Sequence, residues 1–210
     1  AAGSLRPGSP FSDDDRQAGA DAIEREVEYL NRLVTNLLDL SRIEAGALRP
    51  HRELHDLDDL LVRAIESARA RLGTRRLEID LRAATVEVDA VFVDEAVANL
   101  LDNALKYTPS TPERPGVVTA RVRGTHAAGT LTLEVEDNGP GIPAAERAHV
   151  LQPFYRVLGS QVDGSGLGLP IVEEIARQHQ ASVDIEDAHP GEQPPGTRFT
   201  VRFKPRVDTG

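Results

Sequence analysis

The sequence predicts an α+β fold: a two-layer α/β sandwich with helices on one face of a mixed sheet, preceded by a long amphipathic helix. Two patterns support this prediction. Residues 13–45 carry apolar side chains at helical spacing over a length that few globular helices reach. From residue 57 onward, helical periodicity alternates with the two-residue alternation that is typical of strands.

Composition narrows the function classes. The 210 residues are 40% hydrophobic, include no cysteine or methionine, and carry a formal net charge of −10. Because an acidic surface repels phosphate backbones, we expect no nucleic-acid binding. Disulfide scaffolds and thiolate metal sites are excluded. No stretch approaches the ~18 apolar residues of a spanning helix, which predicts a soluble, cytoplasmic chain. The lack of methionine even at position 1 indicates a fragment or a processed product.

The first 56 residues divide into three parts. Residues 1–12 are rich in glycine, serine and proline and predict a flexible lead-in. A helix is expected over residues 13–46, with Gly46 as its stop. The 4-3-4-3 spacing of its apolar seam favours a partner helix, and packing on its own domain is the alternative. The seam residues are Ile23, Val27, Leu30, Val34 and Leu37. Residues 47–56 are expected to form a linker and the first strand.

Residues 57–205 are expected to form the sandwich, and residues 206–210 a tail. Helices are predicted at 57–72, 91–107 and 167–180, with a short one at 143–151. Strands are predicted at 77–81, 86–88, 117–122, 131–135, 182–185 and 198–203. Residues 152–166 form a loop with three glycines.

The helix at 91–107 has one apolar face and one polar face. Glu95, Asn99, Asn103 and Lys106 fall within an arc of about 80°. Carboxamide oxygens suit Mg²⁺ beside phosphate oxygens, and a lysine one turn further on supplies a charge for phosphate. A plain solvated face is the alternative interpretation.

The segment Val135–Pro143 places an acid at the end of a strand, followed by a glycine-rich turn. A buried carboxylate accepts a hydrogen bond from the exocyclic amine of adenine and repels the carbonyl oxygen of guanine. Glycine lets the backbone approach a flat base closely. An ordinary turn between a strand and a helix is the alternative, because Asn-Gly and Pro-Gly form turns readily.

Two further segments complete the pattern. Gly164-Ser165-Gly166-Leu167-Gly168-Leu169 opens a helix, where backbone N–H groups can hold phosphate. Its spacing is neither the dinucleotide fingerprint nor a Walker loop. Upstream, Pro153-Phe154-Tyr155-Arg156 has the composition of a lid with an arginine for the terminal phosphate. A surface loop with an aromatic plug in the core is the alternative.

In this order, the motifs resemble the N, G1, F and G2 boxes of sensor histidine kinases. The four segments are Asn99–Tyr107, Asp137–Ile142, Pro153–Arg156 and Gly164–Leu169. Gly196-Thr197-Arg198-Phe199 looks like the family's closing strand. The resemblance covers residues 13–204. It implies the Bergerat-type ATP-binding sandwich that is shared with gyrase, the heat-shock 90 chaperones and MutL.

The resemblance also implies roles for individual residues. Asp137 would hold the adenine amino group, and Asn103, with Asn99 nearby, would bind Mg²⁺. Lys106 and Arg156 would contact phosphates and, with Asn99, act in catalysis, under an ATP lid at 152–166. The remaining implied ATP contacts are Tyr107, Gly139, Gly141, Ile142, Phe154, Tyr155, Gly164, Ser165, Gly166, Leu167, Gly168, Leu169 and Thr197.

Residues 13–46 look like the second helix of the dimerisation and phosphotransfer hairpin, and 36–46 are similar to its usual end. Residues 23–50 are also similar to potassium-system sensor kinases of the KdpD type. The implied partners are ATP, the protein's own phosphoacceptor helix, a second copy in the full-length parent and the receiver domain of a response regulator. The parent is expected to be an inner-membrane sensor. None of the six histidines has the neighbours of the family's phosphoacceptor, so we expect the acceptor upstream of residue 1.

Two alternative functions are an ATP hydrolase of the same fold and a degenerate dimerisation scaffold. ATP hydrolases of the same fold place a glutamate where Asn99 stands, and an amide cannot take the proton of an attacking water. A degenerate scaffold would dimerise through residues 13–45 without binding nucleotide, but the glycine-rich segments and Asp137 argue against it.

Overall fold

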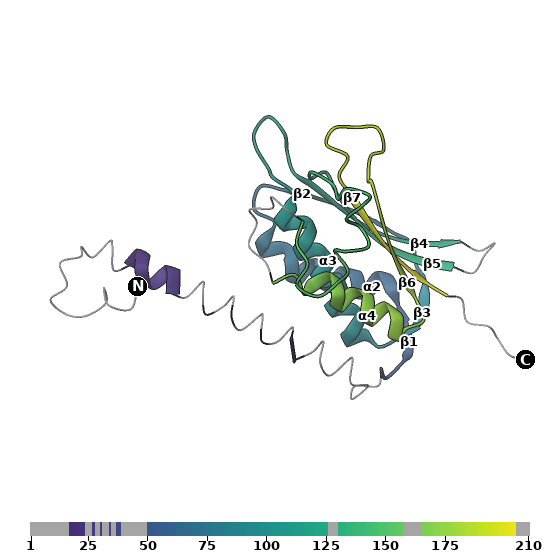
Figure 1. Ribbon diagram of the computed structural model, residues 1–210. Coiled ribbons are helices and arrows are strands. Elements are labelled where there is room, and N and C mark those ends of the chain that lie inside the picture. Colours follow the sequence, from purple (N-terminus) through teal and green to yellow (C-terminus); the bar gives the residue numbers. More distant parts are fainter. Residues whose placement is uncertain are drawn as a thin grey trace, which may run out of the picture.

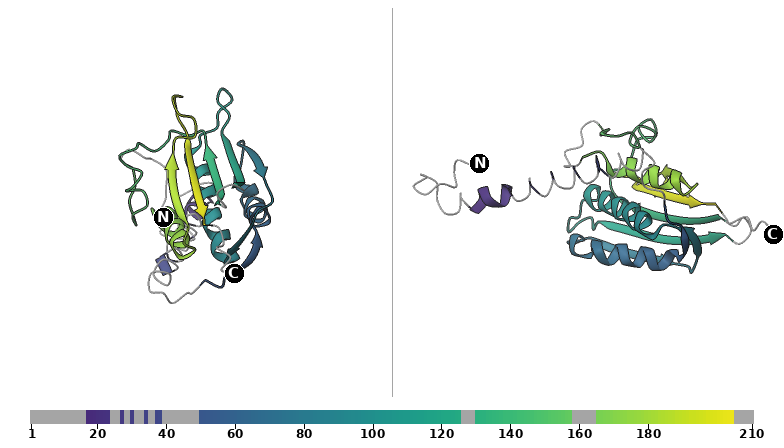
Figure 2. Two further views of the ribbon diagram at one scale, coloured as in Figure 1. Left: turned by 90° about the vertical axis from the view of Figure 1, so that its right-hand side faces the viewer. Right: turned by 90° about the horizontal axis from the view of Figure 1, so that it is seen from below.

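The computed structural model describes residues 50–125, 130–157 and 165–204, residues 17–23, and single positions at 27, 30, 34, 37 and 38. Its centre is a two-layer sandwich in which three helices lie on one face of a five-stranded sheet (Figures 1 and 2). The helices are α2 (Leu57–Ala68), α3 (Ala90–Tyr107) and α4 (Gly168–Gln178). No described helix is long and apolar enough to cross a membrane.

The large sheet has the strand order β2-β4-β5-β7-β6. Its strands are β2 (Arg76–Leu81), β4 (Val117–Thr125), β5 (Thr130–Asp137), β7 (Thr197–Phe203) and β6 (Ser182–Glu186). β2 and β4 are parallel and the other pairs are antiparallel, so the sheet is mixed, as predicted. A separate antiparallel pair joins β1 (Glu53–Asp56) to β3 (Thr85–Val88).

The core fills the space between the helices and the inner face of the sheet. Strand alternation turns every second side chain of β4, β5 and β7 toward the helices, where these apolar groups are removed from water. The fully buried side chains include Leu57, Leu60, Leu61, Ile65, Leu100, Leu101, Leu133, Leu167 and Ile171. α3 contacts both α2 and α4 and is therefore the central helix of its layer.

The outer face of the sheet is held by ion pairs across the strands. Glu136 on β5 is only 4% exposed and pairs with Arg121 of β4 and Arg198 of β7. Burial by itself raises the pKa of the Glu136 carboxyl, but the hydrogen bonds and charges of the two arginines outweigh it and hold the pKa below its usual value. Arg202 and Asp184 form a further pair at 2.6 Å.

The predicted sandwich elements agree in type with the structure, apart from residues 143–151. This segment forms successive turns instead of a helix: Glu146 N–H donates to the Pro143 carbonyl at 2.8 Å, and His149 N–H donates to Glu146 at 2.9 Å. Arg147, in its middle, donates to the Ile142 carbonyl and pairs with Asp187, which follows β6. Such tertiary contacts override the helix propensity of a short segment. The helix predicted at 57–72 ends at Ala68 and continues as the 3-10 turn η2 (Arg69–Arg71).

The described residues between 17 and 38 are helical, in agreement with the predicted N-terminal helix. The described seam residues Val27, Leu30, Val34 and Leu37 are between 43% and 52% exposed, so they do not pack on the sandwich. Residues 1–16 and 39–49, including the expected lead-in and the stop at Gly46, lie outside the described residues.

The backbone at the end of α4 predicts how a substitution of Gln180 changes the stability of the fold. Gln180 N–H donates to the Arg177 carbonyl at 3.0 Å and Ala181 N–H to the Ala176 carbonyl at 2.8 Å, the two bonds of a Schellman motif. Gln180 occupies the left-handed position with φ +55°, where glycine is favoured. Gln180→Gly should therefore raise the free energy of unfolding by about 1 kcal/mol, measured by urea denaturation. Gln180→Ala retains the strained Cβ and should have little effect; equal stability of wild type and Gln180→Gly would contradict the prediction.

Candidate nucleotide-binding site

α3 presents the predicted polar face at one side of the sandwich. Asp89 caps the helix, its Oδ1 accepting the N–H groups of Val91 at 3.0 Å and Phe92 at 3.4 Å. One face of α3 is buried in the core, which leaves Asn99 and Asn103 half-buried on the other face. Asn99 Nδ2 donates to the Glu95 carbonyl at 3.0 Å. Asn103 Nδ2 is buried and has no hydrogen-bond partner among the described residues.

The glycine-rich segment at the start of α4 lies directly against this face. A Cβ at Gly168 would stand 2.9 Å from Asn99 Oδ1, so the start of α4 lies in close contact with this side chain of α3. Leu167 beside it is fully buried, and its N–H donates to Ser165 Oγ at 3.3 Å. Leu169 is half-buried. The fold thus brings the first and fourth motifs together, although Asn99 and Gly168 are 69 positions apart in the sequence.

Asp137 ends β5 and is 4% exposed. Its Oδ1 accepts the N–H of Gly139 at 2.8 Å and the N–H of Thr197 at 3.3 Å. Burial raises the pKa of the Asp137 carboxyl to about 6, and the hydrogen bonds from Gly139 and Thr197 only partly offset this effect. At neutral pH the group is therefore a buried carboxylate whose charge is balanced by backbone donors and the Thr197 hydroxyl.

Glycines allow the backbone to converge on this carboxylate. A Cβ at Gly139 would lie 2.5 Å from the carbonyl oxygen of Tyr107, at the end of α3. Gly196, with φ +65°, has room for no side chain because a Cβ would overlap the Asp137 carbonyl oxygen. Gly196 N–H donates to the Gly139 carbonyl at 3.1 Å. Gly141, with φ +80°, packs against Pro195. The end of α3, the turn after β5 and the start of β7 therefore meet around Asp137.

The lid segment is described at its two ends. Phe154 N–H donates to the Gly166 carbonyl at 2.9 Å, and both residues have positive φ angles. Phe154 is 59% exposed. The Tyr155 hydroxyl donates to the Glu146 carboxylate, and this hydrogen bond raises the pKa of the tyrosine. Arg156 is also exposed. Gly164 lies outside the described residues.

Lys106 is held by a neighbouring acid. Its Nζ lies 2.5 Å from Asp102 Oδ2, and Arg71 Nη1 lies 2.8 Å from Asp102 Oδ1. Asp102 therefore carries two cationic partners, one from α3 itself and one from η2.

Sequence reasoning missed two side chains that fix the turn after β5. Asn138 Oδ1 accepts the Val117 N–H at 2.9 Å, while its Nδ2 donates to the Pro115 carbonyl at 3.0 Å. Arg147 donates to the Ile142 carbonyl at 3.0 Å and pairs with Asp187 at 2.5 Å. Asn138 stands inside the motif Asp137–Ile142, in which sequence reasoning assigns no role to this side chain, and the sequence around Arg147 gives no signal of its contacts.

Residues 88–207 match the family of histidine kinase-, DNA gyrase B-, and HSP90-like ATPases. The chain belongs to this family. It is 38% identical over 206 residues to the signal transduction histidine-protein kinase/phosphatase MprB of Mycobacterium sp. (strain KMS), and 39% identical over 193 residues to MprB of Mycolicibacterium smegmatis. These matches cover 97% and 90% of the chain but 38% of each relative, so the chain spans well under half the length of these curated relatives.

Solved structures agree with this assignment. The mycobacterial sensor histidine kinase MprB superposes with a TM-score of 0.65 at 32% identity, covering 74% of this chain and 99% of that one. The Acinetobacter baumannii histidine kinase AdeS gives 0.72 at 24% identity, covering 94% and 87%, which supports the fold alone. The sandwich is thus an ATP-binding catalytic domain of the histidine kinase type.

Two glycines with positive φ test the packing around Asp137. Gly196→Ala introduces both left-handed strain and a collision with the Asp137 carbonyl, so it should lower the free energy of unfolding by about 3 kcal/mol or more. Gly191→Ala has similar strain at φ +88° but no atom within 4 Å of the new Cβ, and should lower it by about 1 kcal/mol. Urea denaturation of both variants checks the difference; equal losses would contradict the close approach.

Proposed function

We propose that this chain binds Mg-ATP and donates its γ-phosphate to a histidine of a hairpin outside the described residues, for relay to a response-regulator aspartate. The observation that carries the proposal is the buried Asp137, where the end of α3, the turn after β5 and the start of β7 meet. The membership of the chain in the ATPase family and its likeness to sensor kinases support it.

The environment of Asp137 suits adenine. Its carboxylate is ionised at neutral pH and can accept the exocyclic amine of adenine while repelling the carbonyl oxygen of guanine. The glycines at 139 and 141 expose backbone to a flat ring. Gly141 and Ile142 are only half-buried, so the turn presents its surface to a ligand.

The polar face of α3 suits Mg²⁺ and phosphate. Asn103 has a buried amide N–H₂ with no partner among the described residues, and such a donor fits a phosphate oxygen. The amide oxygens of Asn103 and Asn99 are of the type that would hold Mg²⁺. When bound, the metal would neutralise charge on the phosphates. Ser165, Gly166 and Gly168 supply the glycine-rich start of α4 beside Asn99.

Lys106 can turn to phosphate without leaving an unpaired acid. Asp102 would keep its ion pair with Arg71 when Lys106 moves away. Lys106 therefore serves, in this proposal, as the mobile phosphate contact, with Arg156 of the lid as the second. Phe154, Tyr155, Tyr107 and Thr197 complete the proposed contact surface.

Partners and location follow from the proposed kinase role. The exposed seam of Val27, Leu30, Val34 and Leu37 would pack in a helical hairpin of the homodimeric parent. That hairpin would carry the phosphoacceptor histidine and receive the response regulator. The catalytic domain would work in the cytoplasm, beneath a sensor in the inner membrane.

Substitution of Asp137 tests adenine recognition. Asp137→Asn should weaken binding of an ATP analogue with Mg²⁺ by at least about tenfold, because the amide offers a donor toward the adenine amine. Isothermal calorimetry measures the loss, and Asp184→Asn on the outer face is the matched control.

The raised pKa of Asp137 predicts in which direction ATP-analogue affinity and stability change with pH. As pH falls through about 6, Asp137 takes up a proton and analogue affinity should fall. Its contribution to the free energy of unfolding should change in the opposite direction, because the folded state binds this proton more tightly than the unfolded chain. The affinity change attributable to this group should be missing in Asp137→Asn; an identical pH profile in both proteins would contradict the assignment.

A measurement of ATP hydrolysis distinguishes the proposed kinase function from an ATPase function. The Asn99 amide cannot act as a general base, so ATP turnover by the isolated chain should stay near background. Addition of a separate hairpin that carries a histidine acceptor should instead produce acid-labile labelling from γ-labelled ATP, measured by filter binding. Steady hydrolysis without an acceptor would favour the ATPase function, whereas tight ATP binding with no transfer to any hairpin would contradict the kinase proposal alone.

A further inference from the structure

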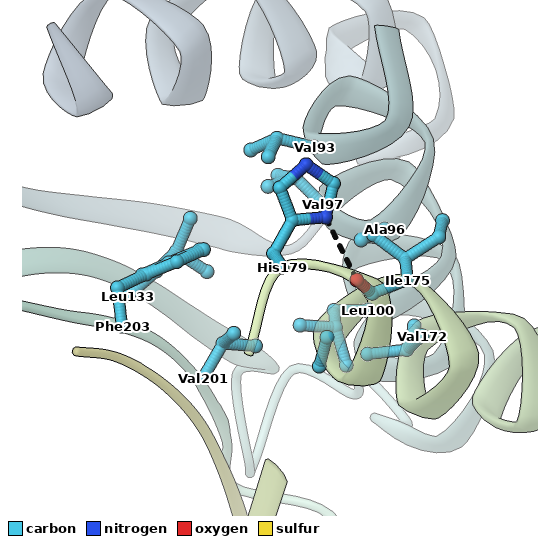
Figure 3. Close-up of a pocket in the computed structure, with 11 residues that line it drawn as sticks. Val93, Ala96, Val97, Leu100, Leu133, Val172, Ile175, His179, Val201 and Phe203 are labelled. Atoms are coloured by element: carbon cyan, nitrogen blue, oxygen red, sulfur yellow. Dashed lines mark hydrogen bonds between the residues drawn. The ribbon is translucent and has the colours of Figure 1, made fainter. Parts of the chain in front are cut away.

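His179 is a buried titratable residue outside the nucleotide site. It follows the last turn of α4, is 7% exposed, and stands at the edge of a small apolar cavity between α3, α4 and strands β5 and β7 (Figure 3). The ring of Phe92 meets it edge-on at 87°, with centroids 6.3 Å apart. Nothing in the proposed nucleotide chemistry uses this imidazole.

The partners of the two ring nitrogens fix the tautomer of His179. Nδ1 lies 2.8 Å from the carbonyl oxygen of Ile175, drawn as a dashed line in Figure 3. A carbonyl oxygen can only accept, so Nδ1 carries the proton. Nε2 accepts the backbone N–H of Asp89 at 3.0 Å. The ring is therefore neutral and has no proton on Nε2.

Asp89 joins this ring to the linker that precedes the sandwich. While its Oδ1 caps α3, its Oδ2 accepts the N–H of His51 at 2.8 Å. Arg52, the next linker residue, donates to the carbonyl of Gln178, immediately before His179. The linker is thus bonded to the start of α3 through His51 and to the end of α4 through Arg52. These two attachments flank the hydrogen bond between Asp89 and His179.

We infer that His179 is a positioning residue that fastens the linker to the sandwich through Asp89, and that protonation of its ring releases this attachment. A protonated ring carries N–H groups at both nitrogens, so Nε2 would face the Asp89 N–H with a second donor. The new positive charge would also draw the Asp89 carboxylate away from the His51 N–H.

The groups around the His179 ring determine in which direction its pKa is shifted. Burial lowers the pKa of His179 below the usual 6.5; the Ile175 hydrogen bond raises it, the charge of Arg52 lowers it, and Asp89 raises it. Strands β5 and β7 present apolar side chains to the cavity, namely Leu133, Val201 and Phe203. The attachment is therefore complete at pH 7.5 and is lost only when the pH falls below the usual 6.5 of histidine. A docked Arg52 favours the neutral ring, which in turn holds the linker.

The tautomer gives the first test, on the full chain in solution. Long-range nitrogen–proton NMR spectra at pH 7.5 should show His179 protonated at Nδ1 and unprotonated at Nε2, the reverse of the tautomer that free histidine prefers in water. A proton on Nε2 at this pH would overturn the inference.

Hydrogen exchange tests the coupling. The protection factors of the His51 and Asp89 amides, corrected for the intrinsic effect of pH, should fall together by at least about fivefold as the ring protonates. The amide of Leu101, in the middle of α3, should keep its protection. A His51 amide that remains protected beside a charged ring would contradict the coupling.

Two substitutions separate positioning from packing. His179→Gln places an amide oxygen near the position of Nε2, so protection of the His51 amide should persist at pH 7.5 and in mild acid. His179→Leu removes the acceptor, so protection should be low at both. The exposed His149→Gln is the control and should retain the wild-type response.

Arg52→Gln adds a test that leaves the core intact. Removal of the linker charge should move the titration of the His179 ring to higher pH. If His179→Leu does not fold, the inference is still tested by the NMR measurement of the tautomer and by the variants His179→Gln and Arg52→Gln. A His179→Gln protein that loses His51 protection in acid would overturn the inference, because another group would then carry the response.

Discussion

The structure depends on placing one carboxylate, Asp137, in the interior without a cationic side chain bonded to it. A buried acid of this kind is tolerated only if hydrogen-bond donors approach it closely. The backbone N–H groups of Gly139 and Thr197 do so. This approach in turn requires glycine at 139 and 196, where a side chain would collide with neighbouring backbone. The convergence of three segments on Asp137 is therefore a condition for the site.

Strand alternation separates this acid from its neighbour. Glu136 and Asp137 are adjacent, equally buried and on opposite faces of β5. Glu136 pairs with two arginines, which hold its pKa down, whereas burial dominates at Asp137 and raises its pKa to about 6. The first carboxylate stabilises the outer face of the sheet. The second has no arginine partner, and this contrast is why we propose Asp137, not Glu136, as the acid that binds the ligand.

The sequence predicted most of the fold because periodicity reports which face of an element is buried. It also predicted the polar face of α3 and the positions of the glycine-rich turns, because those depend on residue type at fixed spacing. It did not predict Arg147 on Ile142 and Asp187, or His179 on Asp89. Arg147 and Asp187 are 40 positions apart and Asp89 and His179 are 90 apart, and surface charges and a single histidine have no periodic signal. The failure of the helix at 143–151 has the same origin, since tertiary contacts outweigh propensity in a short segment.

α3 joins the linker contact at Asp89 to the turn after Asp137 within one rigid helix. Its first residue follows Asp89, which holds the linker, and its last residue, Tyr107, lies against Gly139 in the turn after Asp137. An 18-residue helix spans about 27 Å, and Asn99 and Asn103 lie between its ends. A packed helix transmits displacement as a unit because its core contacts do not deform continuously. Any change in how the linker docks at Asp89 therefore acts on an element that also forms one wall of the proposed nucleotide site, without a separate relay between them.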